Sequence, residues 1–135
     1  MAWRLLIVDD DADFASETSR FLESTGDYEV AHVTDVNEVM RFLEGQKWDL
    51  ILLDVMLESP GAGFGLLRRI KANPRTRSLP VVLLSAVRRE FPWEYELDEK
   101  GLPAQAFLEK PLDGEKLIGL IQSLLGPPSA KTRVE

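Results

Sequence analysis

The chain has 135 residues, enough for one domain with a buried core, and 44% of them are hydrophobic. Its 16 lysines and arginines against 23 aspartates and glutamates give a formal net charge of −7. This balance argues against direct binding to nucleic acid or to an anionic membrane surface, because both need clustered cations. The lack of cysteine excludes disulfides and thiolate metal sites. No apolar run has the length of a signal peptide core or a membrane span, so we expect a cytoplasmic protein.

Five short apolar runs predict β-strands, and each ends on or beside polar residues. They cover residues 4–10, 28–33, 49–54, 80–85 and 106–109. The run that ends at Asp54 holds four consecutive large aliphatic residues. A strand of this kind is buried on both faces, which is typical of a parallel sheet covered by helices. The run at 28–33 alternates enough to predict a strand nearer the edge of the sheet.

Helical periodicity fills most of the intervals between these strands. It predicts helices over 11–24, 35–45 and 114–125, and a further helical face that begins at Phe64 and ends before Pro74. The first helix carries an apolar set at helical spacing: Phe14, Ala15, Thr18, Phe21 and Leu22. Residues 57–65 predict a glycine-rich loop, and residues 86–105 are the least regular segment. We divide the chain into a domain at 1–126 and a polar tail or linker stub at 127–135.

The alternation of strands and helices predicts an α/β fold, a single doubly wound, five-stranded parallel sheet with helices on both faces. Right-handed crossovers place the carboxyl ends of all parallel strands at one edge of the sheet, where such folds bind their ligands. Polar residues that are far apart in the sequence should therefore meet at this edge. These residues are Asp9, Asp10, Asp54, Ser85 and Lys110.

Three carboxylates at one edge repel one another and need a cation. Because no histidine or cysteine accompanies Asp9, Asp10 and Asp54, we expect a hard cation, Mg²⁺ or Mn²⁺ in its place. Asp54 would keep an oxygen that can attack a phosphorus atom. The Lys110 ammonium could neutralise one phosphoryl oxygen and the Ser85 hydroxyl could donate a hydrogen bond to another. These residue types suit the formation of an aspartyl phosphate on Asp54.

These elements, in this order and each at a strand end, resemble the receiver domain of two-component response regulators. The resemblance runs from about Arg4 to Leu125 and includes Ser85-Ala86 after the fourth strand and Lys110-Pro111 after the fifth. It implies the flavodoxin-like strand order 2-1-3-4-5. It also implies that Asp54 accepts a phosphoryl group from a phosphohistidine on a sensor histidine kinase or a histidine phosphotransfer protein. The chain would then be a signalling switch and not an enzyme with turnover.

The resemblance also assigns roles within the site. The protein ligands of the metal would be Asp9, Asp10, Asp54 and the backbone carbonyl of Met56. Ser85 and Phe107 would be the switch residues, although Phe107 fits a static core aromatic equally well. Phosphorylation would change the face made by the fourth helix, the fifth strand and the fifth helix. That face would serve a downstream protein partner, a missing output domain or a homodimer formed on phosphorylation.

Two segments depart from the family pattern. Members usually carry a Pro-x-x-Asp-Gly loop after the acceptor strand, and residues 58–65 lack that aspartate. Residues 88–93 are unlike a simple helix start, which predicts a displaced or short fourth helix. Met56 and Val87 flank the path of a hydrolytic water in this family. Both are apolar here, so we expect slow autodephosphorylation.

Two other functions fit parts of the pattern. A haloacid-dehalogenase-like phosphatase also uses a strand-end aspartate with Mg²⁺, but it expects an acid two residues after the nucleophile, where Met56 stands. A phosphorylation-independent, receiver-like scaffold would be favoured by a missing acceptor, acid pair or lysine, and none of these is missing. The stop at residues 126–128 reads equally as a natural terminus or as the start of a linker.

Overall fold

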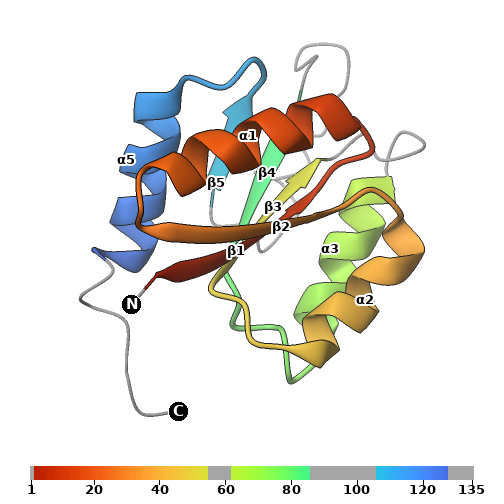
Figure 1. Cartoon of the computed structure of the whole chain (residues 1–135). Coiled ribbons are helices and arrows are strands. Elements are labelled where there is room, and N and C mark those ends of the chain that lie inside the picture. The colour runs from red at the N-terminus through yellow and green to blue at the C-terminus, as the bar shows by residue number, and fades with distance from the viewer. Residues whose placement is uncertain (1, 55–61, 86–105, 128–135) are drawn as a thin grey trace.

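The computed structural model describes residues 2–54, 62–85 and 106–127, in which strands alternate with helices (Figure 1). The elements in chain order are β1 (Trp3–Val8), α1 (Ala12–Ser24), β2 (Tyr28–Val33), α2 (Val36–Gly45), β3 (Leu50–Asp54), α3 (Ala62–Ala72), β4 (Val81–Ser85), β5 (Ala106–Glu109) and α5 (Gly114–Leu125). The predicted strands are all present, and the limits of β5 and α5 agree with the prediction.

The strands form one parallel, five-stranded sheet in the order β2-β1-β3-β4-β5, which confirms the predicted fold. Helices α1 and α5 cover one face, and α2 and α3 cover the other (Figure 1). Since all strands run in the same direction, their carboxyl ends lie together at one edge. We call this the carboxyl edge and the opposite one, where the strands begin, the amino edge.

The central strands β1, β3 and β4 are buried on both faces. One set of their side chains packs in the layer of α2 and α3: Leu6, Val8, Ile51, Leu53, Val81 and Leu83. The alternate set packs in the layer of α1 and α5: Leu5, Ile7, Leu50, Leu52, Val82 and Leu84. Shifting a strand by one residue would draw its terminal polar group into an apolar layer, which is costly. The polar strand ends therefore help to fix the register, and with it the position of the site.

Local sequence signals set the ends of the helices. The Asp11 carboxylate caps α1 by accepting a hydrogen bond from the Phe14 backbone N–H at 3.0 Å. The Asp35 carboxylate caps α2 by accepting a hydrogen bond from the Asn37 backbone N–H at 2.9 Å. Gly126 follows α5 with φ of 82°, a conformation that glycine adopts without strain. The indole N–H of Trp3, at the start of β1, donates to the Gly126 carbonyl at 2.9 Å, so the first strand is tied to the end of the last helix.

Two sequence expectations were wrong. The loop predicted over 57–65 ends earlier, because α3 begins at Ala62. Phe64, Leu66 and Leu67 are buried, and their packing against the sheet outweighs the low helix propensity of the neighbouring glycines. Phe21, which the periodicity groups with the apolar face of α1, is 40% exposed.

The predicted fourth helix and the departures at 58–61 and 88–93 lie outside the described residues and stay predictions. Among the helices that the structure describes, none combines the length and the apolar character needed to cross a membrane.

Candidate functional site

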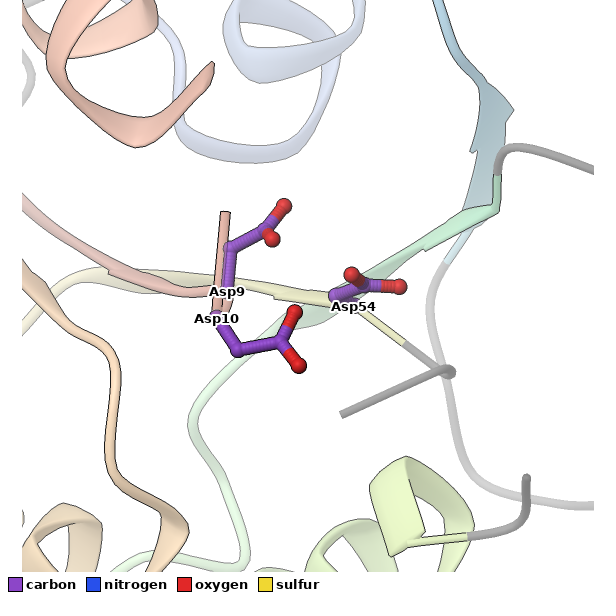
Figure 2. A group of neighbouring side chains, drawn as sticks. All are labelled: Asp9, Asp10 and Asp54. Carbon is purple, nitrogen blue, oxygen red and sulfur yellow. The ribbon is translucent and has the colours of Figure 1, made fainter. Parts of the chain in front are cut away.

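Three carboxylates gather at the carboxyl edge, where the sequence predicts them. Asp9 and Asp10 follow β1, and Asp54 is the last residue of the neighbouring strand β3 (Figure 2). Each offers an oxygen that lies within 4.8 Å of an oxygen of the others. Asp9 and Asp54 are buried, at 0% and 4% exposure, whereas Asp10 is exposed. The cluster therefore joins two desolvated acids to one that faces solvent.

Lys110, which follows the edge strand β5, adds a positive charge to this cluster. Its backbone N–H donates to the Ser85 carbonyl at 2.7 Å, which fixes the end of β5 against β4. Its ammonium lies 2.6 Å from Asp9 Oδ2 and 3.3 Å from Asp54 Oδ2. The other oxygen of Asp9 accepts a hydrogen bond from the Asp11 backbone N–H at 2.9 Å. Asp9 is thus held on both oxygens, and Lys110 bridges two acids that come from different strands.

Burial controls the electrostatics of this arrangement. Desolvation raises the pKa of Asp9 to about 6, and the charge of Asp54 adds to the rise, against the lowering effect of the hydrogen bonds from Lys110 and Asp11. Burial by itself would lower the pKa of Lys110. The hydrogen bond to Asp9 and the charges of both acids outweigh burial, so the pKa of the lysine is raised. The lysine therefore stays charged at neutral pH, and the acids are crowded.

Ser85 ends β4 beside the acids and is buried, at 1% exposure. Its hydroxyl has no hydrogen-bond partner within the described parts of the chain. A buried hydroxyl without a partner costs about 1–3 kcal/mol. A ligand at the carboxyl edge that accepts a hydrogen bond would recover this cost.

The remaining predicted site residues are less fully placed. Phe107 pairs with Leu83 in the sheet register and packs, half-buried, against the layer of α2 and α3. This position suits a core aromatic as well as a switch residue. Met56 and Val87 lie outside the described residues, so the roles predicted for them as carbonyl ligand and as residues that tune hydrolysis remain predictions.

One residue of the site was missed by the sequence reasoning. The ammonium of Lys110 lies 4.1 Å from the centroid of the Phe14 ring. The periodicity of α1 places Phe14 on an apolar face, and no spacing in the sequence relates it to a lysine after β5. An aromatic residue one helical turn beyond the acid pair was the only signal available.

The residues present fit a hard divalent cation, since the donors are carboxylate oxygens and Asp9 and Asp54 are held together in a desolvated place. They also fit an anionic ligand beside the cation. Such a ligand would meet the Lys110 ammonium and, on β4, the Ser85 hydroxyl, which has no partner among the described residues. This combination of a nucleophilic carboxylate with neutralising groups is what phosphoryl transfer requires.

Comparisons with known proteins agree with this geometry. The response regulator receiver domain family matches this chain over residues 5–122. Response regulator Rre1 from Synechocystis sp. is 29% identical over 128 residues, which cover 95% of this chain and 54% of Rre1. The chain thus spans about half the length of that relative.

Two solved structures share the fold over nearly their whole length. The signal receiver domain of a signal transduction histidine kinase from Syntrophus aciditrophicus has a TM-score of 0.80 at 31% identity, covering 99% of this chain and 96% of that chain. The receiver domain of sensor histidine kinase PA1611 from Pseudomonas aeruginosa has a TM-score of 0.80 at 27% identity, covering 93% and 99%. That second structure has a magnesium ion coordinated in its active site cleft.

Proposed function

The chain belongs to the response regulator receiver domain family, and from this premise we propose that it is a phosphorylation-controlled signalling switch with Asp54 as phosphoacceptor. The observation that carries the proposal is the Lys110 ammonium, 2.6 Å from Asp9 Oδ2 and 3.3 Å from Asp54 Oδ2. It places a fixed positive charge beside a buried carboxylate at the ligand-binding edge of the sheet. When Asp54 is phosphorylated, a phosphoryl oxygen would take the place of the carboxylate oxygen that the lysine now contacts.

The donor is a phosphohistidine of a sensor histidine kinase or a histidine phosphotransfer protein. An oxygen of Asp54 attacks the phosphorus, an O–P bond forms, and the N–P bond breaks as the imidazole leaves. Lys110 neutralises one equatorial oxygen, and the Ser85 hydroxyl donates to another, which gives that buried group a partner. The protein then acts as a covalent phosphoacceptor with at most slow autodephosphorylation.

Mg²⁺, or Mn²⁺ in its place, would be held by Asp10 and Asp54, with Asp9 and the Met56 carbonyl completing the protein ligands. Its contribution is to neutralise charge on the phosphoryl oxygens. The magnesium-bound receiver domain of PA1611 supports this assignment by similarity. Both oxygens of Asp9 already accept hydrogen bonds, so we expect Asp9 to orient Lys110 in addition to its role at the metal.

Phosphorylation would draw Ser85 toward the phosphoryl group, and Phe107 would follow it inward. The face built by the predicted fourth helix, β5 and α5 then changes its affinity for a partner. That partner is a downstream protein in the cytoplasm, an output domain joined beyond residue 126, or a second copy of this chain.

Because Met56 and Val87 cannot orient a hydrolytic water, the phosphorylated form should be long-lived. Met56→Asn should shorten its lifetime, and an unchanged lifetime would contradict this role.

The experiment that tests the proposal is the intact mass of the protein after incubation with acetyl phosphate, with and without Mg²⁺. We expect one added phosphoryl group that requires Mg²⁺ and is absent in Asp54→Asn. Asp49→Asn is the matched control, because Asp49 precedes the same strand at the amino edge and should leave the adduct intact. No adduct in the folded wild type, even with a histidine kinase as donor, would favour the scaffold. Continuous phosphate release without an adduct would favour the phosphatase.

A further inference from the structure

The ammonium of Lys110 has a neighbour besides the acids. Its Nζ lies 4.1 Å from the centroid of the Phe14 ring, well within the range of about 6 Å over which a cation is attracted to the face of an aromatic ring. The lysine side chain is only 14% exposed. The attraction is therefore less weakened by water than at an open surface.

The ring is held in place by the same segment that holds Asp9. The Phe14 backbone N–H donates to the Asp11 carboxylate at 3.0 Å, and the Asp11 backbone N–H donates to Asp9 Oδ1 at 2.9 Å. The short stretch from Asp9 to Phe14 thus presents both a carboxylate and an aromatic face to a lysine that arrives from β5. The Asp9 carboxylate and the Phe14 ring together form one binding site for the ammonium. Asp54 lies at the end of the neighbouring strand β3.

We infer that Phe14 is a positioning residue, which keeps the Lys110 ammonium in contact with both Asp9 and Asp54. The inference rests on the proposed function, in which this ammonium meets a phosphoryl oxygen. When Asp54 is phosphorylated, the ammonium must leave Asp54 Oδ2 for an oxygen of the new group. The attraction to a ring face lacks the strict direction of a hydrogen bond, so the ring lets the ammonium move sideways while preventing its escape into solvent.

Graded fluorination of the ring at position 14 tests this role, because fluorine weakens the negative face of the ring while changing its size little. We expect the maximal rate of adduct formation from acetyl phosphate and Mg²⁺ to fall stepwise from mono- to trifluorophenylalanine, by about tenfold in total. The acetyl phosphate concentration that gives half the maximal rate should stay unchanged. Phe14→Leu should be at least as slow as the trifluoro form, and Phe14→Trp should restore the rate.

Phe21→Leu is the matched control. Phe21 lies on the same helix and lines the same groove between α1 and the start of α5 as Phe14 does. No contact of its ring with Lys110 is found among the described residues, and it is 40% exposed. The rate should therefore match that of the wild type. An equal loss in Phe21→Leu and Phe14→Leu would assign the effect to the groove and overturn the inference.

A measurement without phosphorylation separates this inference from the proposed function. The motion of the Lys110 ε-methylene group, followed by NMR relaxation in the unphosphorylated protein, should increase stepwise across the fluorinated series. If the wild type forms no adduct but this graded increase is found, the proposed function fails and the positioning role stands. If the adduct forms normally and neither lysine motion nor rate changes across the series, the positioning role is overturned and the proposed function stands.

Discussion

The two edges of the sheet use a lysine in opposite ways. At the amino edge, Lys71 Nζ donates to the backbone carbonyls of Arg77 at 3.1 Å and Leu79 at 2.6 Å, and burial lowers its pKa. At the carboxyl edge, Lys110 contacts two carboxylates, and its pKa is raised. Lys71 stabilises the loop between α3 and β4, whereas Lys110 neutralises carboxylates that lie close together at the ends of two strands.

The same contrast holds for the other polar groups. Several at the amino edge bind backbone: Asp49 Oδ2 accepts from the Arg4 N–H at 2.7 Å, the Trp48 indole donates to the Phe42 carbonyl at 2.9 Å, and the Thr76 hydroxyl donates to the Ile70 carbonyl at 2.6 Å. At the carboxyl edge, acids crowd one another beside a buried hydroxyl that has no partner among the described residues. Polar groups at the amino edge stabilise the fold, whereas those at the carboxyl edge are arranged to bind a ligand.

The largest expected effect separates the two lysines by function. Lys110→Met should slow adduct formation from acetyl phosphate about 100-fold or more, because the only cation placed within 3.3 Å of Asp54 by the described residues is lost. Lys71→Met should leave that rate unchanged. Intact mass followed over time measures both. A similar loss in the two variants would show that the edges are not functionally distinct.

The next effect concerns pH without divalent cations. The folded chain keeps a proton on Asp9 up to a pH of about 6, while the unfolded chain loses it near 3.8, the ordinary pKa of an aspartate. Between these values the folded state binds more protons, so the stability due to Asp9 falls as pH rises from about 4 to 6 and stays lost above it. The full loss is at most about 3 kcal/mol.

Denaturant unfolding with a chelator, at several pH values, measures this loss. Asp9→Asn should lack the decline, and at pH 7 it should be more stable than the wild type. Adding Mg²⁺ should narrow the difference by stabilising the ionised acids. Parallel pH profiles of wild type and variant would contradict the raised pKa.

Lys71→Met should also lower the free energy of unfolding, by about 1–2 kcal/mol, since two carbonyls lose a charged donor. Denaturant unfolding at pH 7 gives the value. Arg68→Met, an exposed position on the same helix, is the control and should change stability little. If both variants lose the same stability, the two hydrogen bonds of Lys71 contribute nothing specific.

The smallest effect compares the same substitution, aspartate to asparagine, at the two edges. We expect it to change the free energy of unfolding in opposite directions. Asp54→Asn should raise the free energy of unfolding by about 1 kcal/mol in chelator, because it removes one of the crowded negative charges while Lys110 keeps its closer partner Asp9. Asp49→Asn should lower it by about 1 kcal/mol, because a charge-assisted hydrogen bond to the Arg4 N–H becomes a neutral one. Two changes of the same sign would remove the basis of the comparison between the edges.

The fold and the meeting of Asp9, Asp10, Asp54 and Lys110 at one edge could be predicted, because they depend on local patterns. Continuous aliphatic runs before Asp9 and Asp54 mark strands buried on both faces, and the parallel topology then brings their carboxyl ends together. What escaped prediction depends on packing. The contact of Phe14 with Lys110 joins residues on different elements, the exposure of Phe21 depends on how α1 meets α5, and the pKa of Asp9 depends on how deeply it is buried.

The hydrogen bond from the Trp3 indole to the Gly126 carbonyl joins residues 123 positions apart in the chain. Closing so long a loop costs more chain entropy than closing the short ones between neighbouring elements. Pairing of the strands shortens the effective loop before this bond can form, so we expect the end of α5 to dock late in folding. By the same reasoning it should be among the first parts to open, and hydrogen exchange in the last turn of α5 would be faster than in β1. The end of α5 would then dock onto, and detach from, a sheet in which β1 is already paired.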